Sequence, residues 1–369
     1  MNASQKKDNP TVIAFYLPQY HPTPHNDEWW GKGFTEWTNV AKARPLFKGH
    51  YQPKLPADLG FYDLRLPETR RDQAEMARQY GVDAFCYYHY WFGNGHEELE
   101  RPFNEVLASG QPDFPFMLCW ANESWHAKFW NHDGTNVSRR VLAEQTYPEG
   151  DAEKHFMHLL PAFRDPRYLR IDGKPAFMIY KPFNLPDIKG FIAQWQRLAK
   201  ENGLPGIYFI CQLQLDITDE KIDALLADGF DAVNTSRIFD VWVSRRTFMQ
   251  KLKAAWRRFV LRMPGAKKCS ELYPLFLTDK EKEENIIPTM LPNWDHTPRS
   301  GVTGTVIIDS DPEKFHSHAL DTLRCVSHKK NPIVFLKSWN EWGEGNYVEP
   351  DLRYGRGFLE ALLKAKNEI

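Results

Sequence analysis

The chain has 369 residues, of which 42% are hydrophobic, and its formal net charge is −1. A nearly neutral chain produces no overall field that attracts nucleic acid, so a nucleic-acid partner is not expected. No apolar run approaches the length that spans a bilayer, and no secretory signal follows Met1, so we expect a cytoplasmic protein.

Short apolar runs alternate with helical patterns along the chain. The predicted strands are residues 12–17, 82–90, 114–120, 174–180, 206–213, 232–236, 286–291 and 332–337. The predicted helices are residues 65–80, 97–108, 151–164, 189–202, 219–228, 247–263 and 358–366. Residues 1–10 are polar and are expected to be disordered.

Eight nearly continuous apolar strands separated by helices indicate an α/β fold with a parallel sheet buried on both faces. Eight such units close naturally into a single (β/α)8 TIM barrel with long βα loops, spanning residues 1–369 as one domain. A doubly wound open sheet is the alternative, but no glycine-rich fingerprint follows the first predicted strand.

The five cysteines form no Cys-x-x-Cys pair. Cys86, Cys119 and Cys211 lie in apolar runs and are interpreted as small core residues. An odd number of cysteines without a spacing framework is typical of a reducing compartment.

Polar and aromatic residues follow most of the predicted strands. In chain order they are Tyr16, Gln19 and His21; His89 and Trp91; Trp120, Asn122, Glu123 and Trp125; Tyr180; and Asn293, Asp295 and His296. The carboxyl ends of the strands of an α/β barrel meet on one face, so these side chains are predicted to form a substrate pocket there. For any single residue, a structural hydrogen bond at a strand end is the alternative explanation.

The eighth predicted strand leads directly into Glu341 and Glu344, with Trp339 and Trp342 beside the first carboxyl. Paired carboxyls can protonate a leaving oxygen and assist attack at a sugar carbon, and indole faces can hold a pyranose ring. Aromatic residues make up 14% of the chain, which also suits a carbohydrate site. The alternative is a structural turn with exposed glutamates, but the position after a buried strand favours catalysis.

These strand ends carry motifs that resemble a known family. The segments are residues 15–21 (FYLPQYH), 33–37 (GFTEW), 87–91 (YYHYW), 120–123 (WANE), 292–295 (PNWD) and 338–344 (SWNEWGE). They are similar to the WbsX-like proteins of bacterial polysaccharide and O-antigen loci, which are related to glycoside hydrolase family 99, the endo-α-mannosidases. The resemblance covers roughly residues 12 to 365.

The resemblance implies a (β/α)8 enzyme that cleaves a mannose-type glycosidic bond with retention. Glu341 would deprotonate the sugar 2-hydroxyl, which attacks its own anomeric carbon to give a 1,2-anhydro sugar. Glu344 would protonate the leaving oxygen and then activate water. Gly343, between Trp342 and Glu344, departs from the family 99 pattern.

Further substrate contacts are expected outside the glutamate pair. Trp37, Trp120 and Trp125 are predicted to line the cavity as sugar platforms. Glu36 and Glu123 are additional carboxyls near the expected pocket, and either could replace one member of the pair in the reaction. The predicted substrate is an oligosaccharide or polysaccharide, which could be lipid-linked.

Two other functions remain open. A glycosyltransferase of lipopolysaccharide or O-antigen biosynthesis could run the same chemistry with a sugar hydroxyl in place of water. A nucleotide-sugar enzyme usually needs a diphosphate site, yet Asp309 and Asp311 form the one Asp-x-Asp candidate and lie in a peripheral segment. A non-catalytic glycan-binding protein is the second alternative, and the intact glutamate pair argues against it.

No cofactor is expected. His21, His89 and His296 could suggest a metal site with Asp295 or Glu123, but their spacing fits no helical ligand pattern. Hydrogen bonds to sugar hydroxyls are the favoured role for these histidines.

The stretch from Arg245 to Lys268 contains nine Lys or Arg residues and no Asp or Glu. Phe248, Leu252, Trp256 and Phe259 recur in it at helical spacing. One hypothesis is peripheral contact with an anionic inner-membrane surface. The alternative is an ordinary barrel helix with its charged face in water.

Overall fold

In the computed structural model, which describes residues 9–126, 141–243, 249, 252, 256–257 and 259–369, eight parallel strands form a closed barrel. They are β1 (Thr11–Tyr16), β2 (Ala84–Trp91), β4 (Phe116–Trp120), β8 (Lys174–Ile179), β9 (Tyr208–Leu213), β10 (Ala232–Thr235), β12 (Ile286–Met290) and β14 (Ile333–Leu336). The barrel closes because β1 pairs in parallel with both β14 and β2. The predicted (β/α)8 fold is therefore confirmed.

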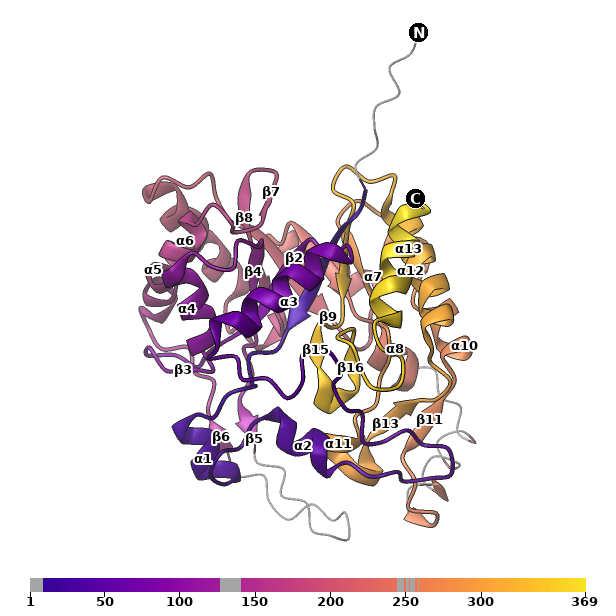
Figure 1. Cartoon of the computed structure of the whole chain (residues 1–369). Coiled ribbons are helices and arrows are strands. Elements are labelled where there is room, and N and C mark those ends of the chain that lie inside the picture. Colours follow the sequence, from indigo (N-terminus) through magenta and orange to yellow (C-terminus); the bar gives the residue numbers. More distant parts are fainter. Residues whose placement is uncertain (1–8, 127–140, 244–248, 250–251, 253–255, 258) are drawn as a thin grey trace.

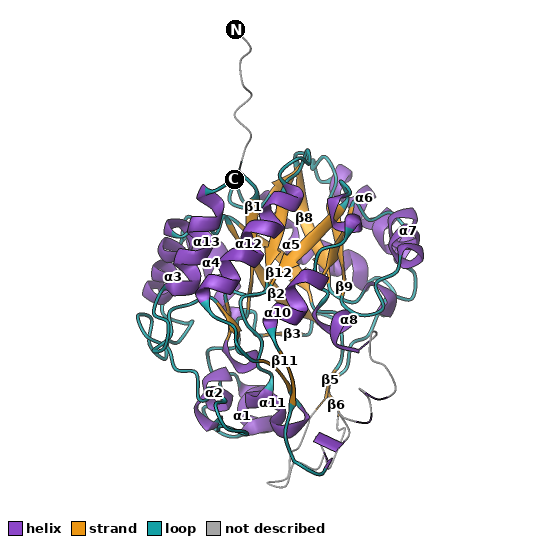
Figure 2. Ribbon diagram, turned by 90° about the vertical axis from the view of Figure 1, so that its right-hand side faces the viewer, coloured by secondary structure: helices purple, strands orange, loops and turns teal. Residues whose placement is uncertain are grey.

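Helices surround the barrel strands on the outside, as Figure 2 shows. They are α3 (Pro67–Gln79), α4 (Arg101–Ser109), α5 (Asp151–Arg164), α6 (Ile188–Glu201), α7 (Asp219–Ala227), α8 (Ile238–Val243), α10 (Cys269–Leu272), α12 (Pro312–Val326) and α13 (Gly357–Asn367). The predicted helix 151–164 matches α5, whereas α12 was not predicted. The predicted helix 247–263 lies partly outside the described residues.

The predicted helix 97–108 begins too early. The structure places Glu97–Glu98 in β3, which pairs antiparallel with the end of β2. Leu99 then takes a left-handed conformation with φ of 59°, and α4 begins at Arg101 with a proline in its first turn. A proline suits the first helical turn because it has no N–H to leave unpaired there.

The long βα loops contain small elements at the carboxyl ends of the strands. These are α1 (Pro24–Trp30), α2 (Glu36–Lys42), α11 (Thr297–Ser300), β5 (Trp125–His126), β6 (Val141–Ala143), β11 (Gly265–Lys267), β13 (Thr305–Ile307), β15 (Asn340–Glu341) and β16 (Asn346–Tyr347); the remaining short strand, β7 (Arg170–Ile171), pairs with the start of β8. In Figure 1, α1, α2 and α11 gather at the end of the barrel opposite the two chain termini. This end is where α/β barrels carry their active sites.

The core is built from the predicted strands. Inside the barrel, Phe15 stacks on Tyr88 and Phe335 with ring centroids 5.5 and 5.1 Å apart. Cys86, Cys119 and Cys211 are buried free thiols, as expected for core residues. None of the helices among the described residues combines the length and apolar character needed to cross a bilayer.

Candidate active site

The segment after β14 folds into a tight hairpin that fixes both glutamates. Asn340 and Glu341 form β15 and pair with β16, and residues Trp342–Glu344 form a single 3-10 turn between them. The Ser338 hydroxyl accepts a hydrogen bond from the Glu341 N–H at 3.0 Å and donates to the Asn346 carbonyl at 2.6 Å. The hairpin is thus tied to the last residues of the barrel.

Glu344 belongs to a chain of three charged side chains. The Arg299 guanidinium donates from Nη1 to Glu344 Oε1 at 2.7 Å and from Nε to Glu36 Oε1 at 2.8 Å. His296 Nε2 lies 3.5 Å from Glu344 Oε1. Glu36 is the first residue of α2, His296 directly precedes α11, and Arg299 lies within α11. This row of ion pairs therefore joins three βα loops.

A cavity of about 330 Å³ opens at this cluster, and we call it the Glu344 cavity. Its lining residues are Gln19, Trp30, Phe34, Glu36, Asn39, His126, His296, Arg299, Ser300 and Glu344. Amides, a hydroxyl, imidazoles and carboxylates beside aromatic rings are suited to a ligand with many hydroxyls and apolar C–H faces.

Glu341 lies in the barrel interior and is only 4% exposed. Its Oε2 is 3.2 Å from Lys337 Nζ, and the same ammonium lies 3.2 Å from the Tyr88 hydroxyl. Asn346 Nδ2 lies 3.4 Å from the same carboxylate oxygen. Lys337 and Tyr88 come from the ends of β14 and β2, so two barrel strands position this carboxyl.

The two glutamates have opposite electrostatic environments. Burial raises the pKa of Glu341, although Lys337 partly opposes this and the charge of Glu344 adds to it. Burial would also raise the pKa of Glu344, but Arg299 and the hydrogen bond from His296 hold it well below its usual range. Glu344 is therefore ionised in the free protein, and Glu341 is the carboxyl that gains a proton more readily.

Gly343 has a steric reason to be glycine. A Cβ at this position would lie 1.5 Å from Glu36 Oε1 and 3.0 Å from Arg299 Nε. The missing side chain lets the Glu36–Arg299 pair lie directly against the turn that carries Glu344.

Several predicted residues do come together at this end of the barrel. Gln19, Glu36 and His296 line the Glu344 cavity. The Tyr180 ring packs edge-on against Tyr88 with centroids 6.0 Å apart. Burial and the charges of Glu123, Glu344 and Glu341 raise the pKa of the Tyr180 hydroxyl. Trp125 is half-buried and packs against Tyr90, whose pKa is raised by burial and by Glu341.

Other predicted residues belong to a buried network behind the hairpin, centred on Glu349. The Glu349 carboxyl accepts hydrogen bonds from Trp342 Nε1 at 2.7 Å, Tyr62 OH at 2.9 Å and Gln73 Nε2 at 2.7 Å. Tyr16 joins the network by donating to Gln73 Oε1 at 2.6 Å. Trp37 Nε1 donates to the Tyr62 carbonyl at 2.8 Å. In the structure Tyr16 and Trp37 lie behind the hairpin, and Trp342 anchors the hairpin turn to the same network.

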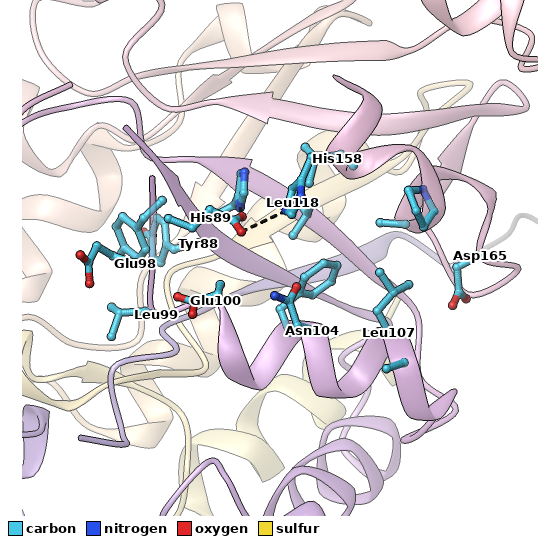
Figure 3. Close-up of a pocket in the computed structure, with 17 residues that line it drawn as sticks. Tyr88, His89, Glu98, Leu99, Glu100, Asn104, Leu107, Leu118, His158 and Asp165 are labelled. Carbon is cyan, nitrogen blue, oxygen red and sulfur yellow. Dashed lines mark ion pairs between the residues drawn. The ribbon is translucent and has the colours of Figure 1, made fainter. Parts of the chain in front are cut away.

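His89, Trp91 and Trp120 point outward, toward α5. Trp91 stacks on His155 with centroids 4.7 Å apart, and Trp120 packs edge-on against the same ring at 4.8 Å. His89 Nε2 lies 2.8 Å from His155 Nε2, and burial lowers the pKa of His89 to about 4. His89 faces a separate cavity of about 520 Å³ between α4 and α5, and Figure 3 shows both His89 and His158 at this cavity.

The remaining predicted residues fix loop conformations. His21 Nδ1 contacts the Pro18 carbonyl at 3.0 Å, and Asn122 bridges the N–H and carbonyl of Lys181 at 2.8 Å each. Asp295 is buried and accepts from His50 and Gln52 at 2.7 Å each. The Asn293 side chain accepts from the next residue's N–H. These contacts are of the kind expected for strand-end hydrogen-bonding residues.

We expect the Glu349 network to contribute strongly to stability. Glu349→Ala would leave three buried donors unpaired, so the free energy of unfolding should fall by on the order of 3 kcal/mol at about pH 5. Burial raises the pKa of Glu349 to about 7, so the carboxyl stabilises the fold at low pH and loses this contribution as pH rises through that value. Urea unfolding should show the deficit shrinking toward about pH 8.

Glu360→Ala on the exposed side of α13 is the matched control, with an expected change below about 0.5 kcal/mol. A Glu349→Ala deficit no larger than that of the control would show that the three hydrogen bonds contribute little.

Arg299 and Lys337 are the main site residues that sequence reasoning did not select. Arg299 lies in a short helix with no motif around it, so no sequence signal identified it. Lys337 could have been found, because a lysine at the end of a wholly apolar strand needs a buried partner.

Comparisons with known proteins agree with this architecture. A solved structure titled "Glycoside hydrolase-like protein" matches with a TM-score of 0.62 and 16% identity, over 99% of this chain and 96% of that chain. The family 99 endo-α-mannosidase from Bacteroides thetaiotaomicron matches with a TM-score of 0.55 and 15% identity, over 97% of this chain and 96% of that chain. At these identities the likeness concerns the fold.

Sequence comparison is more specific. The family model described as "Glycosyltransferase WbsX" matches residues 12–362. The "Uncharacterized protein WxcX" of Xanthomonas campestris pv. campestris is 36% identical over 96% of this chain and 49% of that protein, so the chain spans about half the length of this relative. The resemblance found in the strand-end motifs is confirmed, and the chain belongs to the WbsX family.

Proposed function

We propose that the protein is a carbohydrate-active enzyme that cleaves a glycosidic bond with retention, in a mannose-type bacterial polysaccharide or O-antigen glycan. The supporting observation is that Glu341 and Glu344 lie on one short hairpin at the carboxyl ends of the barrel strands, where Glu344 lines a cavity of about 330 Å³ and Glu341 is buried against Lys337. A pair of carboxyls in different electrostatic environments is what acid–base chemistry at a sugar requires.

The proposed proton transfers follow the roles that the resemblance to family 99 implies for Glu341 and Glu344. Glu341 takes the proton of the sugar 2-hydroxyl, and the oxygen attacks C1 as the bond to the leaving oxygen breaks. Glu344 gives its proton to the leaving oxygen and later takes one from the water that attacks C1. As this attack opens the 1,2-anhydro ring, Glu341 returns its proton to O2. Before the first step Glu344 must be protonated, so Arg299 must release it when substrate binds.

The ligand-free electrostatics favour the exchanged assignment, with Glu341 as the acid and Glu344 as the base. Glu341 has the raised pKa, and Glu344 is held ionised by Arg299. The two assignments use the same residues and give the same products, and they differ in how each glutamine variant responds to the leaving group.

A glycosyltransferase of lipopolysaccharide or O-antigen biosynthesis is the second candidate, and the description of the matching family model favours it. A sugar hydroxyl replacing water at the second step would convert cleavage into transfer without any change in the carboxyl pair. Glycan binding without catalysis is the third candidate.

A digest of a bacterial and mannose-type glycan panel with product analysis, run beside a nucleotide-sugar turnover assay, separates these functions. Cleavage products without nucleotide release support the hydrolase. Nucleotide release with a lengthened glycan would support the transferase, and tight binding without turnover in either assay would support the binding protein. The Glu341→Gln/Glu344→Gln double variant is the control for contaminating activity.

We also propose peripheral contact with anionic lipid through the basic stretch of residues 245–268, part of which lies outside the described residues. Of its described residues, Met249, Trp256, Phe259 and Val260 are 71, 54, 74 and 63% exposed. Basic residues near an anionic surface contribute about 1 kcal/mol each, and exposed apolar side chains add contacts that salt does not screen.

Co-sedimentation should therefore show binding to phosphatidylglycerol vesicles that moderate salt weakens but does not abolish. Trp256→Ser should lower the bound fraction, whereas Phe183→Ser, which removes a similarly exposed ring elsewhere, should not. Equal sedimentation with neutral and anionic vesicles would rule out a role for the basic residues, and no sedimentation at low salt would leave the stretch as a solvated surface.

A further inference from the structure

Two imidazoles and a carboxylate come together between α1 and the β2–β3 hairpin. The ligand atoms of His25, His96 and Glu98 all lie within 4.8 Å of one another. His25 Nδ1 contacts Glu98 Oε1, and His96 Nε2 lies 2.8 Å from the same oxygen. We infer that these three side chains bind a divalent transition-metal ion of the Zn²⁺ or Co²⁺ type.

The surrounding backbone holds the ligands in place without a metal. Glu98 pairs with Tyr90 across the β2–β3 hairpin, and its turn contains Gly93, Asn94 and Gly95, all with left-handed φ values. The His96 N–H donates to the Gly93 carbonyl at 3.0 Å, which places the imidazole at the end of this turn. The hairpin thus presents His96 and Glu98 together.

His25 is held from the other side by α1. Thr23 caps this helix by accepting from the Asn26 N–H at 3.1 Å, and Pro24 occupies the first turn. The His25 ring stacks on Trp29, one turn later, with centroids 5.3 Å apart and planes 15° apart. The ring is therefore fixed with Nδ1 toward Glu98, and binding would need little reorganisation.

The local charge favours a cation. Glu97, Glu98 and Glu100 place three carboxyls within four residues, and Figure 3 shows Glu98 and Glu100 on the side of the outer cavity away from His158. The adjacent Arg101 donates to Glu105 at 2.7 Å instead. Glu97 pairs with His158 at 3.0 Å, and within the described ranges none of these three carboxyls has a recorded Lys or Arg ion pair.

Glu98 itself is buried, with 4% exposure. Within the described ranges, its recorded ion pairs are with His25 and His96, which carry charge only when protonated. A buried carboxylate needs a positive partner, and a metal ion held between the three side chains supplies one while the imidazoles stay neutral.

The donor set indicates the class of metal. Two imidazole nitrogens and one carboxylate suit Zn²⁺, Co²⁺, Ni²⁺ or Fe²⁺ better than Ca²⁺ or Mg²⁺, which prefer oxygen ligands. Three protein ligands leave coordination positions for water. None of the three residues lines the Glu344 cavity, so the proposed metal site is separate from the glutamate pair.

The proposed ion would stabilise the packing of α1 against the β2–β3 hairpin. It would join α1 to the β2–β3 hairpin, and aromatic rings on both sides of this junction pack on Trp125. Trp29 lies 6.0 Å and Phe92 5.4 Å from the Trp125 ring. Trp125 in turn packs on Tyr90 at 4.9 Å. The ion therefore acts as a positioning element for this aromatic wall.

Metal titration of the full chain tests the inference. After chelation and dialysis, the protein should bind one equivalent of Co²⁺ with visible d–d absorption, and Zn²⁺ should displace it. Loss of a direct ligand in Glu98→Gln or His96→Gln should weaken Co²⁺ binding by at least about a hundredfold, because even outer partners of ligands contribute about ten- to hundredfold. The thermal midpoint of the wild type should rise with Zn²⁺.

Glu100→Gln is the matched control, because it removes the same charge two residues away from Glu98 and should change the affinity by less than about threefold. Circular dichroism establishes that each variant is folded. Absence of stoichiometric Co²⁺ binding at 1:1 in the wild type, or equal weakening by Glu98→Gln and Glu100→Gln, would overturn the site and leave ordinary His–Glu hydrogen bonds.

Discussion

Replacing Glu341 or Glu344 with glutamine is expected to lower turnover of a natural glycan by at least about a hundredfold, the usual contribution of a positioned acid or base. Glutamine keeps the size of the side chain but cannot take or give a proton at the reacting oxygen. Each variant should retain its fold, since Lys337 and Arg299 keep a hydrogen-bond acceptor. The measurement is kcat/KM on the substrate identified in the panel digest.

An activated substrate then separates the two proton roles. A leaving group such as 2,4-dinitrophenolate needs no protonation, so the variant that lacks the acid should recover most of its loss on that substrate. The variant that lacks the base should stay slow on both substrates. Recovery of Glu344→Gln supports the assignment from the family resemblance, and recovery of Glu341→Gln supports the exchanged one. Full activity of either variant on the natural glycan would remove that residue from the mechanism.

Removing the Arg299 guanidinium is expected to affect both activity and stability. Arg299→Met leaves Glu36 and Glu344 facing each other without their shared positive partner, so the free energy of unfolding should fall by roughly 3 kcal/mol. The pKa of Glu344 should rise, because Arg299 is the main group that lowers it. The limb of the pH–rate profile that reports Glu344 should therefore move to higher pH.

Arg299→Lys keeps the charge but loses one of the two hydrogen bonds, so its profile should lie between those of the wild type and Arg299→Met. Arg197→Met is the matched control, since Arg197 pairs with an exposed glutamate on α6 and should contribute less than about 1 kcal/mol. An unchanged pH profile in a folded Arg299→Met protein would show that Arg299 does not set the ionisation of Glu344.

The barrel could be predicted from sequence because its strands are buried on both faces. Runs such as residues 174–180 and 332–337 are almost wholly apolar, and each is separated from the next by a helix-length segment. Helix α12 was missed even though its N-cap Asp311 and Pro312 are typical of a helix start. Its charged and histidine-rich turns obscured the apolar stripe of Phe315, Ala319 and Leu323.

The candidate site could be predicted only in part, because a strand end does not say which way a side chain points. Successive strand residues face opposite sides, so Tyr88 points into the barrel beside Lys337 while His89 points toward α5. The predicted pocket residues therefore included His89 but not Tyr88. The same alternation places Phe15 inside the barrel and Tyr16 outside it.

The other site features that the sequence did not predict depend on contacts between residues far apart in the chain. The Glu36–Arg299 contact joins residues 263 positions apart, and the reason for Gly343 is the Glu36 carboxylate lying against it. Neither relation has a local pattern in the sequence. The metal ligands His25, His96 and Glu98 similarly meet through tertiary structure.

The most direct test of the proposed function is time-resolved ¹H NMR of the first product that the wild-type enzyme releases from an α-linked substrate. Retention through two successive displacements at C1 predicts that the α-anomer appears first and then mutarotates. If the β-anomer appears first, water attacks C1 directly and the proposed role of the glutamate pair is contradicted.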